Sequence, residues 1–242
     1  MKRSTFLILA LFLFSCKSSH HKFDPEARKL NDLAVNLRDM VFSKNITPEH
    51  IKINTSVKNP ADIQYNVKPH EINDDSLYEK KIDLLNQALK IDSNYFTAYW
   101  NKFEYQNRLK QYAGALSTGK QLVRLSPNDV RVKFEIGKAY DRVRDTVHSW
   151  VYYEEYLFSC NSVLDTMSVN NKDRRSMEFS KAMALILLGQ EKKGRDILKR
   201  LYDTETKIEE KPMDSLYMTA TRKDLIYGKE IRIGNSFYSI SP

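Results

Sequence analysis

Asn94–Leu157, NYFTAYWNKFEYQNRLKQYAGALSTGKQLVRLSPNDVRVKFEIGKAYDRVRDTVHSWVYYEEYL, is the stretch that decides the fold. Its apolar residues recur at three- and four-residue steps, which is the spacing of amphipathic helices. The two halves of the stretch align at a period of about 34 residues, which is typical of a solenoid of helix-turn-helix repeats. The sequence therefore predicts antiparallel helix pairs that stack side by side.

Similar apolar stripes extend this interpretation in both directions. We expect helices at about 24–42, 76–91, 94–109, 111–125, 128–144, 146–160, 173–188, 190–202 and 212–227. Most connections are short, so neighbouring helices must pack antiparallel. Gly189 is expected to end a helix as a left-handed cap. The fold class is therefore all-α, a helix-turn-helix solenoid.

Two segments depart from helical spacing. Residues 44–75 contain three prolines and alternate only weakly, so a small β-hairpin and an irregular loop both stay open there. The tail alternates on both sides of Gly234-Asn235, which predicts a second hairpin. We expect a signal peptide at 1–15, a lipidated tether at 16–23, the helical domain at 24–204 with its insertion at 44–75, and a C-terminal helix and tail at 205–242.

The N-terminus has the pattern of an export leader. Lys2 and Arg3 precede an unbroken apolar run, FLILALFLF, which is too short to span a bilayer but suits a secretory signal. Leu13-Phe14-Ser15-Cys16 resembles a bacterial lipobox, and the alternative is an ordinary cleaved signal with an incidental cysteine. The resemblance implies that Cys16 becomes an acylated N-terminus and anchors the protein stably to a membrane. Because Lys17 and not Asp follows Cys16, we expect a periplasm-facing outer-membrane lipoprotein.

Charge and cysteine content limit the possible functions. The formal net charge is +8, but basic and acidic residues are interspersed, which favours a solvated helical surface over a patch for anionic lipid or an acidic partner. Export disfavours nucleic acid as a partner. Cys160 follows a helical pattern and is expected to be a buried small hydrophobe. His20 and His21 lack further ligands at useful spacing, so we expect no metal and no cofactor.

The central stretch resembles the tetratricopeptide repeat (TPR) family. The matching positions of the first full unit are Ala98, Tyr99, Trp100, Asn101, Leu109, Tyr112, Ala115, Leu116, Leu125 and Pro127, and those of the next are Ile136, Gly137, Tyr140, Ser149 and Tyr153. The chain departs from the family where Lys102-Phe103 replaces the usual Leu-Gly. It departs again at Gly119, where a large aromatic residue is usual.

The resemblance implies a groove lined by the first helices of successive repeats, which accepts a protein or peptide segment. By position, this partner-binding groove would comprise Trp100, Asn101, Glu104, Arg108, Arg131, Phe134, Lys138 and Arg142. Basic and aromatic side chains together suit an extended, partly acidic peptide. In the other interpretation, Trp100 and Phe134 belong to the core and the charges only solvate the groove.

Three functions are weighed on this basis. The first is a lipid-anchored scaffold or adaptor in the bacterial envelope. The second is an immunity-type or inhibitor lipoprotein that neutralises a secreted toxin or enzyme. The third, an envelope-polymer hydrolase, is disfavoured, because four of the five His residues precede the repeats and no Gly-rich phosphate loop, HExxH or GxSxG motif occurs. We therefore expect a protein that is not an enzyme.

Overall fold

The computed structural model describes residues 23–44, 74–169, 171, 173–204, 217–233 and 236–240. The helices are α1 (Pro25–Lys44), α2 (Asp74–Ile91), α3 (Phe96–Arg108), α4 (Tyr112–Leu125), α5 (Val130–Arg142), α6 (Thr146–Thr166), α7 (Arg174–Leu187), α8 (Glu191–Thr204) and α10 (Arg222–Tyr227). Two strands follow, β1 (Lys229–Ile233) and β2 (Ser236–Ile240). The predicted helical class is confirmed, with boundaries that differ from the predicted ones by a few residues except at the last helix.

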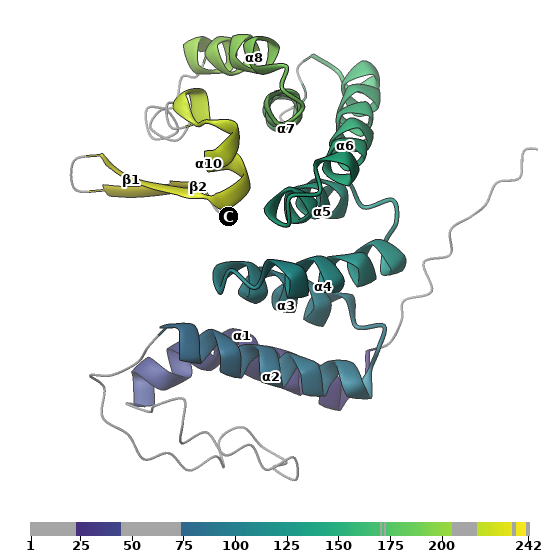
Figure 1. Ribbon diagram of the computed structural model, residues 1–242, viewed down its shortest axis with the longest axis vertical. Helices are drawn as coiled ribbons and strands as arrows, with labels where there is room; N and C mark the ends of the chain where they lie inside the picture. Colours follow the sequence, from purple (N-terminus) through teal and green to yellow (C-terminus); the bar gives the residue numbers. More distant parts are fainter. Residues whose placement is uncertain are drawn as a thin grey trace, which may run out of the picture.

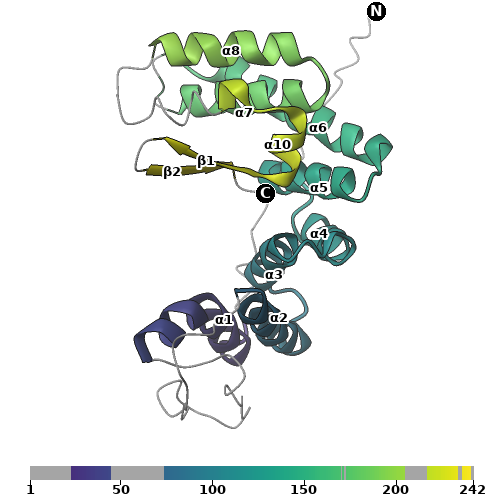
Figure 2. The ribbon, with the colours of Figure 1, turned by 60° about the vertical axis from the view of Figure 1, so that its left-hand side comes forward.

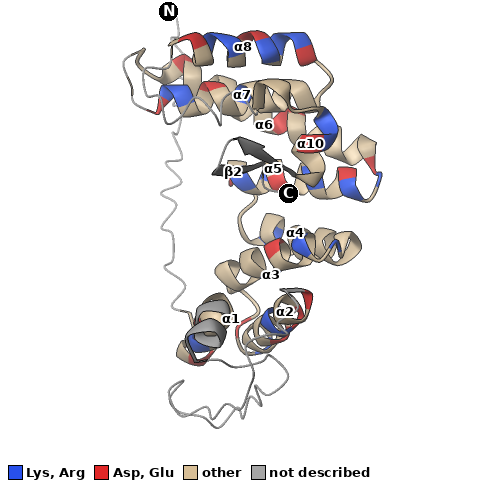
Figure 3. Ribbon diagram, turned by 90° about the vertical axis from the view of Figure 1, so that its left-hand side faces the viewer, with Lys and Arg blue, Asp and Glu red and all other residues tan. Residues whose placement is uncertain are grey.

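Helices α1 to α8 pack as four successive antiparallel pairs (Figure 1). The pairs stack along the long axis of the molecule, as Figure 2 shows, and each pair also contacts the next. This arrangement is the predicted helix-turn-helix solenoid. Basic and acidic residues are distributed over the helices without separating into two faces (Figure 3).

Short turns set the antiparallel geometry of the pairs. Lys110, after α3, and Arg144, after α5, have positive φ angles of 57° and 66°, and they lie at equivalent places in consecutive repeats. Gly189 takes the same left-handed conformation after α7, with φ of 74°, so its predicted role as a cap is confirmed. Asp129 and Asp145 then start α5 and α6 by accepting hydrogen bonds from free backbone N–H groups.

A glycine packed against an aromatic ring joins the two helices of a pair. In α5 and α6, an ideal Cβ on Gly137 would lie 2.6 Å from Cε1 of the fully buried Tyr153. In α3 and α4 the two residue types are exchanged: the aromatic ring is that of Phe103 on α3, and the glycine it packs against is Gly119 on α4. Phe103 and Gly119 stand one repeat period before Gly137 and Tyr153. The two departures from the TPR pattern therefore compensate each other.

The C-terminal segment differs from its prediction. A single helix to Tyr227 was expected, but Ala220 and Thr221 lie outside a helix and Thr221 begins α10 with a capping box to Asp224. The predicted hairpin is confirmed, because β1 pairs antiparallel with β2 and Lys229 lies opposite Ile240. The possible hairpin at 44–75, the leader and Cys16 lie outside the described residues.

Candidate functional site

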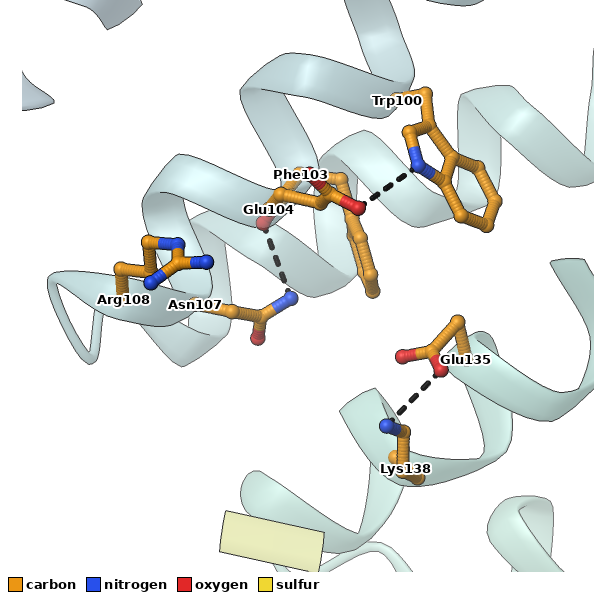
Figure 4. Close-up of a pocket in the computed structure, with 7 residues that line it drawn as sticks. All are labelled: Trp100, Phe103, Glu104, Asn107, Arg108, Glu135 and Lys138. Atoms are coloured by element: carbon orange, nitrogen blue, oxygen red, sulfur yellow. Dashed lines mark hydrogen bonds and ion pairs between the residues drawn. The ribbon is translucent and has the colours of Figure 1, made fainter. Parts of the chain in front are cut away.

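A pocket lies between α3 and α5, the first helices of two successive pairs. Figure 4 shows its lining residues, which are Trp100, Phe103, Glu104, Asn107, Arg108, Glu135 and Lys138. The volume is about 160 Å³. Pockets for drug-sized ligands measure roughly 300–1,000 Å³. The pocket can therefore accept one or two side chains of a polypeptide more readily than a cofactor.

Trp100 forms an aromatic rim at one end of the pocket. Its indole Nε1 donates a 2.9 Å hydrogen bond to Oε1 of Glu104, one turn further along α3. The Arg131 guanidinium lies 5.7 Å from the centre of the Trp100 ring, and the Arg131 side chain is 77% exposed. The rim thus combines a half-buried ring with an accessible cation, which is the combination enriched at protein interfaces.

Charges of both signs line the pocket wall. Lys138 is buried and its Nζ lies 2.9 Å from Oε1 of Glu135. Burial raises the pKa of the Glu104 carboxyl, an effect that the Trp100 hydrogen bond opposes. Arg108 is exposed at the other end, stacks over the Tyr78 ring at 5.8 Å, and has no ion pair among the residues that the structure describes. A carboxylate of a bound partner could therefore form an ion pair with Arg108.

The structure brings four of the eight predicted groove residues into this pocket: Trp100, Glu104, Arg108 and Lys138. Arg131 lies at the rim over Trp100. Asn101 instead donates a 2.8 Å bond to Oδ1 of Asn31 and thereby joins α3 to α1. Partner binding by all these residues stays a prediction.

Of the other two predicted groove residues, Phe134 is half-buried and Arg142 is buried. The Phe134 ring packs against Tyr153 and Tyr156, at 4.7 Å from the latter, and Nζ of Lys138 lies 5.2 Å from its centre. Arg142 is only 4% exposed. Its Nη1 donates to Oδ1 of Asn107 and its Nε to the backbone oxygen of Ile226, each at 2.8 Å. The expectation that Arg142 lines an open groove is therefore corrected, whereas a role of Phe134 in the groove stays a prediction.

Three pocket residues were missed at the sequence level: Phe103, Asn107 and Glu135. Asn107 follows Trp100 and Glu104 at helical spacing, so extending their stripe by one turn would have found it. Its Nδ2 donates to the Phe103 carbonyl at 3.0 Å, which turns Oδ1 toward Arg142. Phe103 could not be found in this way, because its place depends on the exchange with Gly119.

The C-terminal segment 217–228 covers the face next to this pocket. Helix α10 packs against α5 and α7 (Figure 2). Arg222 donates to the Leu187 carbonyl at 2.8 Å and to Oδ2 of the buried Asp141 at 2.6 Å. The Tyr227 ring meets the Tyr112 ring edge-on at 5.9 Å. The segment is connected to the pocket through Arg142, which donates both to the Ile226 carbonyl and to Asn107 of the pocket lining.

The described residues contain no group of three or more His, Cys, Asp or Glu with the geometry of a metal site. None of the helices described here is long and apolar enough to cross a bilayer. Cys160 is fully buried and free, as predicted, and burial raises the pKa of its thiol to about 11.

Comparison with known proteins adds little to this description. No family model matches the sequence, and no curated protein matches it. Among solved structures, the chain is similar to YrrB, described as a TPR protein with an unusual peptide-binding site. The match covers 81% of this chain and 89% of that chain, with 11% sequence identity and a TM-score of 0.41. The solenoid fold is established by the observed helix pairs.

Proposed function

We propose that this protein is a scaffold or adaptor that binds a polypeptide segment of a partner along the first helices of its repeats. The observation that carries the proposal is the pocket between α3 and α5, which presents the Trp100 rim and the accessible cations Arg108 and Arg131. An aromatic anchor flanked by arginines is the usual composition of an interface hot spot. The small volume of the pocket suits one side chain of the partner, and the rest of the partner's segment would lie along the first helices of the repeats.

The charge of the pocket narrows the chemistry of the partner. Lys138 and Glu135 neutralise each other, and Glu104 is engaged by Trp100. Arg108 lies over the Tyr78 ring and forms no ion pair among the described residues, and the 77% exposed side chain of Arg131 pairs with Asp129. A partner with an acidic side chain near an apolar one would therefore pair with Arg108 and cover the Trp100 ring.

We further propose that the protein is anchored in the outer membrane through Cys16 and faces the periplasm. The sequence of the leader supports this location. Mass spectrometry of the purified protein should find an acylated Cys16 at the N-terminus, and Cys16→Ala should move the protein from the membrane to the soluble fraction. An unmodified N-terminus at another residue would contradict the anchor while leaving the binding site untouched.

A pull-down tests the binding site. The tagged protein is purified from detergent-solubilised envelopes as the wild type and as Arg108→Glu, Arg131→Glu and Lys192→Glu. Lys192 is an exposed residue of α8 and serves as the matched charge-reversal control. We expect one or more proteins to copurify with the wild type and the control and to be lost from both pocket variants. Partners that copurify equally with all four proteins would refute a site between α3 and α5.

A further inference from the structure

Segment 217–228 is bound to the solenoid in the manner of a peptide ligand. Three of its polar contacts with the helices are made through its own backbone: Arg195 of α8 donates to the carbonyls of Met218 and Ala220, and Arg142 of α5 donates to that of Ile226. Backbone carbonyls occur in every polypeptide, so these arginines do not select this particular sequence. The surface built by α5, α7 and α8 is therefore able to bind a polypeptide main chain.

Apolar and charged contacts add to this binding. Ala220, Leu225 and Ile226 are buried in one core cluster with Ile186, Leu187 and Tyr153. Arg222 is the one side chain of the segment that reaches a buried carboxylate, that of Asp141. Because the segment follows α8 in the chain and is not part of the helix pairs α1 to α8, it can leave this surface without separating those pairs. A free α10 would not stay helical, because six residues are too few for a stable helix in water.

The Arg142 guanidinium lies 6.0 Å from the centre of the Tyr112 ring and is incompletely hydrogen-bonded by its present neighbours. Both of its hydrogen-bond acceptors are neutral, one an amide oxygen and the other a carbonyl oxygen, and its Nη2 is buried with no hydrogen bond. Within the described residues Arg142 forms no ion pair. A buried guanidinium is best compensated by a carboxylate, which accepts two parallel hydrogen bonds.

We propose that residues 217–228 are an exchangeable internal ligand, and that a partner segment carrying a carboxylate displaces them and pairs with Arg142. This inference rests on the proposed function and extends the partner's path from the pocket between α3 and α5 onto α5 and α7. Segment 217–228 then limits access to the surface of α5 and α7: the partner binds fully only when the segment has left.

A labelled peptide of residues 217–228 tests the exchange on the full-length protein. Arg222→Ala weakens the binding of the internal segment and changes no residue of the surface beneath it. The added peptide retains Arg222, so it competes with an internal segment that binds less tightly. We expect the peptide to bind Arg222→Ala at least ten times more tightly than the wild type, by fluorescence anisotropy. Lys223→Ala, an exposed change in the same helix, should behave as the wild type.

The contrary results are equally clear. If Arg222→Ala keeps its circular dichroism spectrum and binds no peptide, segment 217–228 is a fixed part of the core. The proposal also fails if Arg222→Ala unfolds the whole solenoid, since the segment would then be integral to it. Either failure leaves the Arg108 and Arg131 pull-down unaffected, so the two proposals are tested separately.

A pair of shorter peptides tests the carboxylate. Residues 217–226 are prepared with a free C-terminal acid and as the amide, which places a carboxylate or a neutral group where Arg142 now contacts Ile226. The free acid should bind Arg222→Ala roughly tenfold more tightly than the amide, and Arg142→Gln in the same background should remove the difference. Equal affinities of acid and amide would overturn the role of Arg142.

Discussion

Gly137→Ala measures how closely α5 and α6 approach. An ideal Cβ at this position lies 2.6 Å from Cε1 and 2.8 Å from Cδ1 of Tyr153. The Tyr153 ring cannot move away easily from an added methyl group, because it is fully buried and its hydroxyl donates a 2.9 Å hydrogen bond to Asp141. Overpacking of this kind costs about 1–3 kcal/mol. The better helix propensity of alanine returns about 1 kcal/mol. Because the ring is held in place, we take the overpacking cost from the upper part of its range. We therefore expect Gly137→Ala to lower the free energy of unfolding by about 1–2 kcal/mol.

Gly114→Ala is the matched control. Its added methyl group would meet only the amide group of Gln106, with Nε2 at 2.9 Å and Cδ at 3.5 Å, which is the far end of a flexible side chain. This variant should be as stable as the wild type or more stable by up to about 1 kcal/mol. Since 1 kcal/mol shifts Tm by about 2–4 °C in a domain of this size, thermal melts by circular dichroism resolve the two. A Gly137→Ala protein as stable as Gly114→Ala would refute the close packing of this pair.

Three further predictions concern polar and titratable groups. Asp141→Ala should lower the free energy of unfolding by roughly 3 kcal/mol in urea titrations, because Tyr153, Ser149 and Arg222 all lose a buried acceptor; a loss below about 1 kcal/mol would contradict this. The pKa of Glu104 is raised by burial, so it gains a proton at a higher pH than an ordinary carboxyl. While the partner's own carboxylates stay ionised, an acidic partner should therefore bind more tightly as the pH falls toward this pKa, and Glu104→Gln should lack this increase; the same pH dependence in the wild type and in Glu104→Gln would count against the pocket. Burial keeps the Cys160 thiol protonated below a pH of about 11, so a thiol reagent at pH 8 should label it only after unfolding, and rapid labelling of the native protein would show that it is accessible.

The helix pairs could be predicted from the sequence because each helix carries an apolar stripe that one partner must cover. The pairing of Gly137 with Tyr153 is visible in the repeat pattern. The pairing of Phe103 with Gly119 is not, because each residue alone looks like a departure from that pattern. Only their contact across α3 and α4 explains both.

The candidate site was predicted in part for a similar reason. Trp100, Glu104 and Arg108 share one stripe of α3, so sequence spacing places them on one face. Whether Arg142 faces solvent depends on α10, which arrives from the distant end of the chain. A contact between residues so far apart in the sequence leaves no local signal, so Arg142 was expected to be open and is covered. The division of the chain into leader, tether, helical domain and tail stays a prediction.

Photo-crosslinking in intact cells tests the central claim most directly. A crosslinking amino acid replaces Trp100 at the pocket or, as a control, the 72% exposed Phe158 on α6. We predict a discrete protein adduct from position 100 that Arg108→Glu abolishes, and no such adduct from position 158. Identical adducts from both positions, or none from position 100, would contradict a scaffold that holds its partner between α3 and α5.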